Sequence, residues 1–157
     1  MNATRRNDLV VFLATGCFTG FLPKMPGTWG TLAAIPIVII THRTTTIVQT
    51  ITAVIFVAFA AWIAGRAEVL FKDRDARPIV IDEMVGFLIT LLWLPLNFLT
   101  LCLGFFLFRL FDIVKPPPIS TVEKRLHGGW GIVLDDVLAG VFANVTLRLL
   151  LIAAGIL

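Results

Sequence analysis

Residues 84–108, MVGFLITLLWLPLNFLTLCLGFFLF, contain no charged side chain, and their path decides how the rest of the chain is arranged. Pro95 removes a helical hydrogen bond, and Asn97 suits a turn. The run is therefore either one kinked helix or a tight hairpin. We favour the hairpin, for a reason that lies in the charged residues on both sides of it.

Acidic residues stand just outside both ends of this run. A single membrane-spanning helix would leave Asp82 and Asp112 on opposite sides of the membrane, whereas a hairpin returns both to one side. The arms of the hairpin would be 79–94 and 98–114, each about 24–26 Å long at ~1.5 Å per residue. This is slightly short of a ~30 Å bilayer core, so we expect the acids to lie near the headgroups.

The composition supports a membrane setting for the whole chain. The 157 residues are 58% hydrophobic with a mean hydropathy of +0.95, and only 15% are charged, against roughly 25% in soluble domains. IVQTITAVIFVAFAAWIAG (47–65) is long enough to span a bilayer core. We predict an all-α fold: a compact polytopic membrane helical bundle with short helices, formed by a single domain over residues 1–157.

The distribution of basic residues predicts the orientation. The net charge of +3 is too small and too interleaved with apolar sequence to indicate nucleic acid, and fits anionic lipid better. The expected outer turns, 41–46 and 95–97, contain a single lysine or arginine, Arg43. The other loops carry Arg66, Lys72, Arg74, Arg77, Lys115, Lys124 and Arg125. Because Lys and Arg concentrate in cytoplasmic loops, both acidic regions should face the cytosol, and a last helix at about 136–157 should end outside.

The N-terminal region loosely resembles a signal peptide, because Arg5 and Arg6 precede the apolar run 9–22. Asp8 interrupts the transition and no small-residue cleavage site follows, so we expect an interfacial or packed helix instead. The two cysteines of the chain lack metal-ligand spacing, and we expect them to act as soft apolar residues. They are Cys17 and Cys102.

Two similar stretches, IVIDEMVG (79–86) and IVLDDVLAG (132–140), place paired acids inside apolar sequence. One alternative is helix N-capping, which needs only one carboxylate. A charge in a membrane core costs at least ~2.5–3.5 kcal/mol, and adjacent acids repel unless a cation lies between them. Mg²⁺ favours carboxylate oxygen and keeps water and phosphate as its other ligands. We therefore predict a metal site that includes Asp82, Glu83, Asp135 and Asp136.

A third charged motif is FRLFDIVKPPPI (108–119). Arg109, Asp112 and Lys115 are spaced by three residues and share one side of a helix that Pro116 should end. They form either an interfacial ion pair with a snorkelling lysine or a functional group. In the functional interpretation Asp112 is a metal ligand, and Arg109 and Lys115 hold a phosphate.

Two glycine-bearing loops stand near these charges. LPKMPGTWG (22–30) contains Lys24 and Thr28, which is a plausible N-cap for the segment that follows. LHGGWG (126–131) places His127, Gly128 and Gly129 before the second acid pair. Such loops are usually simple turns, but their amide groups can also bind an anion at a helix N-terminus.

Four stretches in this order, LPKMPGTWGTLAAIP, IVIDEMVG, FRLFDIVKPPPI and LHGGWGIVLDDVLAG, strongly resemble the phosphatidylglycerophosphatase A family over about residues 15–145. The family consists of bacterial, Mg²⁺-dependent membrane phosphatases. The resemblance implies hydrolysis of the terminal phosphomonoester of phosphatidylglycerophosphate, in phospholipid biosynthesis, by a multi-pass protein of the bacterial inner membrane whose active site faces the cytosol.

The resemblance places the site on its three acidic motifs. We predict Mg²⁺ ligands at Asp82, Glu83, Asp112, Asp135 and Asp136. Catalytic roles fall to Asp82, Asp112, Asp135 and His127, with the general base and a carboxylate nucleophile left open. Substrate-binding residues would be Lys24, Thr28, Arg109, Lys115, Gly128 and Gly129.

Other classes fit the pattern less well. Phosphatases with a histidine nucleophile need a Ser-Gly-His motif, and neither His42 nor His127 lies in one. Asp73-x-Asp75 lacks the hydrophobic strand that precedes such a pair in soluble aspartyl phosphatases. A small ion- or proton-coupled transporter remains the main alternative, since intramembrane carboxylates often mark ion pathways, and a lipid-binding scaffold is a second.

Overall fold

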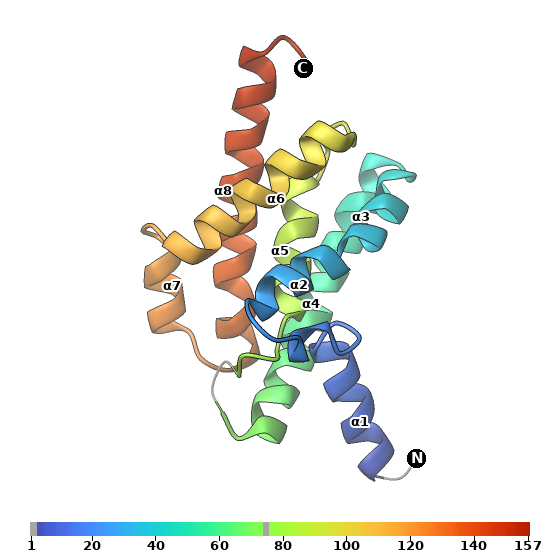
Figure 1. Cartoon of the computed structure of the whole chain (residues 1–157), viewed down its shortest axis with the longest axis vertical. Coiled ribbons are helices and arrows are strands. Elements are labelled where there is room, and N and C mark those ends of the chain that lie inside the picture. Colours follow the sequence, from blue (N-terminus) through green and yellow to red (C-terminus); the bar gives the residue numbers. More distant parts are fainter. Residues whose placement is uncertain (1–2, 74–75) are drawn as a thin grey trace.

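The computed structural model describes residues 3–73 and 76–157, and in these ranges it is all-helical with no strand (Figure 1). The predicted all-α fold is confirmed. Arg74 and Asp75, which entered the sequence analysis, lie outside the described residues. The helices are α1 (Ala3–Ala14), α2 (Pro26–Ala33), α3 (Ile35–His42), α4 (Thr46–Phe71), α5 (Ile81–Leu91), α6 (Phe98–Val114), α7 (Ile119–Arg125) and α8 (Gly128–Ala153), with a short 3₁₀ helix, η1 (Thr19–Phe21), after α1.

Helix α5 is the centre of the bundle and packs against α2, α4, α6 and α8. Its apolar residues Phe87, Leu88 and Leu91 are fully buried, as are Ala143 and Leu147 of α8. Because lipid tails are as apolar as these side chains, close van der Waals packing is the main favourable contribution between α5 and α8. The acidic first turn of α5 is thus held against α8 by the packing beyond it.

The hairpin expected within residues 84–108 is present. Helix α5 ends at Leu91 and α6 begins at Phe98, after a turn that includes Pro95. Asn97 caps α6: its Oδ1 accepts from the Thr100 amide, and its own amide donates to Thr100 Oγ1, both at 3.0 Å. This reciprocal capping box satisfies two helix-end amides, and the chain reverses where the sequence indicated.

Within the described residues, α4 and α8 are the two helices long and apolar enough to cross a membrane (Figure 1). Both present exposed aliphatic side chains, such as Ile51 and Val54 on α4 and Leu149 on α8. This fits a helical membrane protein, since lipid replaces water around such surfaces.

The predicted start of the last helix, at about residue 136, is wrong, because α8 begins at Gly128. The glycines suggested a loop, but Gly129 and Gly131 lie within α8, and Gly128, with φ +69°, begins it. A Cβ atom on Gly129 would collide with the carbonyl oxygen of Ala61 in α4. The missing side chain therefore lets α4 and α8 approach closely at this point.

The N-terminal apolar run is only partly helical. Helix α1 ends at Ala14, and residues 15–25 form turns and η1 instead of continuing a helix to residue 22. The buried side chains of Val10 and Ala14 pack with residues of α4, as expected for a packed helix. Both cysteines are free and exposed.

Candidate active site

The two acid pairs occupy different positions in their helices. Asp82 and Glu83 lie in the first turn of α5, where Val80 is the N-cap and no side chain caps the helix. Asp135 and Asp136 lie two turns inside α8, so neither can cap that helix. N-capping therefore does not explain the pairs, although the first-turn acids of α5 do gain from the helix dipole.

Three of the acids converge on one point. Asp82, Glu83 and Asp136 each offer a carboxylate oxygen, and these oxygens lie within 4.8 Å of one another. Oε2 of Glu83 and Oδ2 of Asp136 are buried and have no hydrogen-bond partner among the described residues. Buried like charges at this spacing repel unless a cation or a proton intervenes. An all-carboxylate oxygen set is what a hard divalent cation prefers, so these residues fit the predicted Mg²⁺.

The FRLFD motif forms a second part of the site. Nη1 of Arg109 lies 2.7 Å from Oδ2 of Asp112 and 3.9 Å from Oε1 of Glu83. Both ion-pair partners of Arg109 are mostly buried, and its own side chain is 16% exposed. The predicted i,i+3 relation on α6 is present, and Arg109 joins α6 to the acidic turn of α5.

Lys115 follows the end of α6 and points toward α8. Its Nζ lies 2.6 Å from Oδ2 of Asp135 and 2.8 Å from Oε1 of Glu123. Burial lowers the pKa of Lys115, but the ion pairs with Asp135 and Glu123 outweigh burial and hold that pKa above its ordinary value. The lysine is therefore charged throughout the pH range of enzyme assays. Glu123 of α7 was missed, and no motif in the sequence identifies it.

All five predicted metal-binding acids line one cavity of about 400 Å³. The buried acids form its floor, whereas Arg77 and the apolar side chains of Met25 and Ile113 are exposed at its rim. Asp112 and Asp135 line the cavity but stand outside the three-carboxylate group, each bound to a basic residue. Charged residues from α5, α6 and α8 thus meet at one place, as the hairpin requires.

Gly27, in the first turn of α2, was also missed by the sequence interpretation. A Cβ atom at this position would overlap Oε1 of Glu83 and lie 2.8 Å from Nη1 of Arg109. Only glycine lets α2 cover the Arg109–Glu83 contact this closely. The contribution of the Pro26–Gly27–Thr28 segment to the site is therefore the absence of a side chain at Gly27, which leaves room for Glu83 and Arg109.

Lys24 and Thr28 are not among the residues that line the cavity. The side chain of Lys24 is exposed, and its carbonyl accepts a hydrogen bond from Nε1 of Trp29 at 3.2 Å. The expectation that Thr28 caps the next helix is wrong. Helix α2 begins at Pro26, with Met25 as N-cap, because proline suits the first position of a helix.

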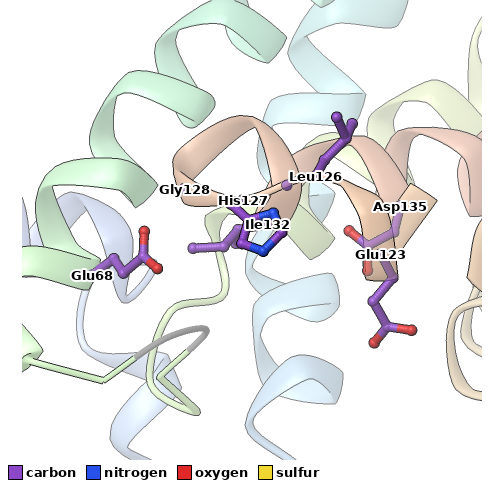
Figure 2. Close-up of a pocket in the computed structure, with 8 residues that line it drawn as sticks. Glu68, Glu123, Leu126, His127, Gly128, Ile132 and Asp135 are labelled. Carbon is purple, nitrogen blue, oxygen red and sulfur yellow. The ribbon is translucent and has the colours of Figure 1, made fainter. Parts of the chain in front are cut away.

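His127 and Gly128 border a separate pocket of about 230 Å³ (Figure 2), whereas Gly129 lines neither this pocket nor the cavity. His127 is exposed, and its Nδ1 lies 3.2 Å from the carbonyl oxygen of Arg125. The carboxylates of Glu68, Glu123 and Asp135 border the same pocket, which makes it an unfavourable place for a phosphate. Asp135 is the residue of this pocket that also lines the larger cavity.

Together, the fold and the cavity are those of an all-helical protein, compatible with a helical membrane protein, with a carboxylate-rich site flanked by basic residues. The family model for phosphatidylglycerophosphatase A matches residues 12–151. The chain therefore belongs to the phosphatidylglycerophosphatase A family.

Curated relatives agree with this assignment. Phosphatidylglycerophosphatase A of Escherichia coli is 34% identical over 132 residues, which cover 83% of this chain and 77% of the relative. The protein of the same name from Haemophilus influenzae is 35% identical over 134 residues, covering 83% and 82%. A candidate phosphatidylinositol-3-phosphatase of Bacteroides thetaiotaomicron is 38% identical over 147 residues, covering 88% and 91%. No solved structure matches the chain.

Proposed function

We propose that this protein is a Mg²⁺-dependent lipid phosphatase. It hydrolyses the terminal phosphomonoester of phosphatidylglycerophosphate to phosphatidylglycerol and phosphate, a step of phospholipid biosynthesis. The observation that carries the proposal is the group formed by Asp82, Glu83 and Asp136 at the floor of a cavity with basic residues in its walls. Membership of the phosphatidylglycerophosphatase A family supplies the substrate.

Asp82, Glu83 and Asp136 are the residues that would hold Mg²⁺. When bound, the ion supplies positive charge at the phosphoryl oxygens and lowers the pKa of water. Arg109 contributes a guanidinium whose Nε is buried without a hydrogen-bond partner among the described residues, so it can donate to a phosphate oxygen. Asp112 orients that guanidinium through their 2.7 Å ion pair.

The proton of the attacking water goes to a carboxylate of the cavity floor in this proposal. His127 is the weaker candidate, because it is exposed and borders the other pocket. Lys115 forms ion pairs with Asp135 and Glu123, and its ammonium faces the same cavity as the floor acids. Positioned charges of this kind are the main protein contribution to phosphoryl transfer.

We place the protein in the bacterial cytoplasmic membrane as a multi-pass protein whose cavity faces the cytosol. Two observations support this placement. Helices α4 and α8 are long and apolar enough to span a bilayer. Exposed Arg77, in the loop before α5, lines the cavity, and exposed Lys124 lies in the last turn of the short helix α7. The apolar rim at Met25 and Ile113 suits the glycerol and acyl part of a lipid.

Phosphate release from phosphatidylglycerophosphate by the purified protein tests the function. We expect turnover with Mg²⁺, and its loss both with EDTA and in Asp82→Asn. The matched control is Asp73→Asn, which removes an exposed acid that does not line the cavity. Full activity of the chelated protein would refute the metal dependence, and no release under any condition would refute the activity.

Phosphatidylinositol 3-phosphate is a second candidate substrate, because one relative of 38% identity carries a candidate phosphatidylinositol-3-phosphatase name. Both lipids have a terminal phosphomonoester and an internal phosphodiester. Their kcat/KM values in the same micelles decide between them, and a higher value for the inositol lipid would replace the proposed substrate.

A further inference from the structure

We propose that Arg77 binds the internal phosphodiester of the lipid substrate and so determines specificity for lipids that carry two phosphates. The inference rests on the proposed function. The basic residues of the cavity differ in whether they form ion pairs. Arg109 and Lys115 are both held by carboxylates, at 2.7 Å and 2.6 Å respectively. Arg77 lines the same cavity, is exposed, and forms no ion pair with a described residue.

The backbone around Arg77 is held at defined points. The amide of Ile79 donates to the carbonyl of Ala76 at 2.8 Å, which closes a turn around Arg77. The amide of Val80 donates to the carbonyl of Ala14 at 2.9 Å, which joins this turn to the end of α1. Because the backbone of this turn is already fixed, only the Arg77 side chain has to be ordered when it binds an anion.

The arrangement of the cavity matches the order of groups in a two-phosphate lipid. The terminal phosphomonoester belongs at the floor, beside the acid group that would hold Mg²⁺. The acyl chains belong in lipid, beyond the exposed apolar side chains of Met25 and Ile113. The phosphodiester lies between these two parts of the molecule, and Arg77, at the rim, is the exposed cation among the described residues that line the cavity. A guanidinium donates two parallel hydrogen bonds to a phosphate.

Two lipids each carry one of the two groups, the phosphodiester that Arg77 would bind and the phosphomonoester that the floor acids would bind. Phosphatidylglycerol keeps the phosphodiester but has no phosphomonoester, whereas phosphatidic acid has the phosphomonoester alone. Binding of phosphatidylglycerol to the purified protein in micelles needs no turnover. We expect Arg77→Ala to weaken this binding about 10- to 100-fold and Arg77→Lys to restore part of it. Lys72→Gln removes an exposed charge beyond the cavity lining and should bind as the wild type does.

Kinetics supply the second measurement. Arg77→Ala should raise KM for phosphatidylglycerophosphate about 10-fold or more with kcat little changed, since the contact is made in both ground and transition states. Its kcat/KM on phosphatidic acid should stay within about 2-fold of the wild-type value. Equal losses on both lipids, or unchanged binding of phosphatidylglycerol, would overturn the inference. A wild-type protein that binds phosphatidylglycerol but releases no phosphate would instead refute the proposed function.

Discussion

Lys115 Nζ lies 2.6 Å from Oδ2 of Asp135, so a residue at the end of α6 is bound to one two turns inside α8. The same ammonium lies 2.8 Å from Oε1 of Glu123 in α7. Three helices therefore meet at one cation. Asp135 is only 7% exposed in its side chain, and a buried carboxylate without a counter-charge is costly.

This ion pair predicts a loss of stability in Lys115→Met. Removal of the cation leaves Asp135 buried and charged, and we expect a loss of about 3 kcal/mol, at the low end of the range for a broken buried pair. Thermal unfolding in detergent measures the effect. Lys124→Met is the matched control, because Lys124 is exposed and forms no ion pair among the described residues. An equal change in both variants would contradict the assigned role of Lys115.

The three-carboxylate group predicts opposite effects on stability and activity. In EDTA, Asp136→Asn should raise the thermal midpoint, because it removes a buried carboxyl group whose ionised form is disfavoured by burial and by neighbouring carboxylates within 4.8 Å. With Mg²⁺, the same variant should lose at least 10-fold in metal affinity and activity. Higher stability with lower activity is expected when a binding site holds like charges together to bind a ligand. Glu68→Gln, outside this group, is the control. A lower midpoint of Asp136→Asn in EDTA would show that the carboxylates do not repel one another.

The sequence predicted which helices meet, but not how their side chains pair. Pro95 and Asn97 identified the hairpin, and the hairpin required Asp82 and Asp112 to share one end of the bundle. Which acid pairs with which base at that end of the bundle depends on how each helix is rotated and at what angle the helices cross. Side-chain packing sets both. Thus Asp135 faces Lys115 and Asp136 faces the α5 acids, although the two are adjacent in sequence. Glu123 escaped detection because no periodic pattern places α7 beside Lys115.

Gly27 should be as important as the charged residues, although it carries no functional group. In Gly27→Ala the new methyl would displace the Glu83 carboxylate and crowd Arg109, so we expect kcat to fall at least 10-fold, as for a displacement of about 1 Å at a catalytic group. Far-ultraviolet circular dichroism should show an unchanged helix content. Gly155→Ala adds an atom with nothing within 4 Å; its φ of +67° costs some stability at the end of α8, but kcat should stay at the wild-type value. Normal activity of Gly27→Ala would mean that Glu83 tolerates displacement.

The proposed orientation predicts which loops are accessible from outside the cell. Serine at Cys17 and Cys102, both free and exposed, provides a cysteine-free background. On that background, a membrane-impermeant thiol reagent should label Arg43→Cys in intact cells and label Lys124→Cys only after permeabilisation. Both positions are exposed in the fold, so their reactivity reports the side of the membrane. The reverse labelling pattern would place the cavity outside.

Substitution of His127 shows whether this residue acts as the general base, as its position in the sequence suggested, or does not, as its position in the fold indicates. The residue stands eight positions before Asp135, which led to a predicted catalytic role, yet its exposed ring borders the smaller, acidic pocket. If a floor carboxylate accepts the proton, His127→Ala should keep kcat within about 3-fold, since loss of a general base costs roughly 10²–10⁴-fold. Gly129→Val is the contrasting change in the same motif: its side chain would collide with Ala61 and separate α4 from α8, so the protein should unfold. A loss of 100-fold or more in His127→Ala, with thermal stability retained, would return the general base to His127 and require the two pockets to act together through Asp135.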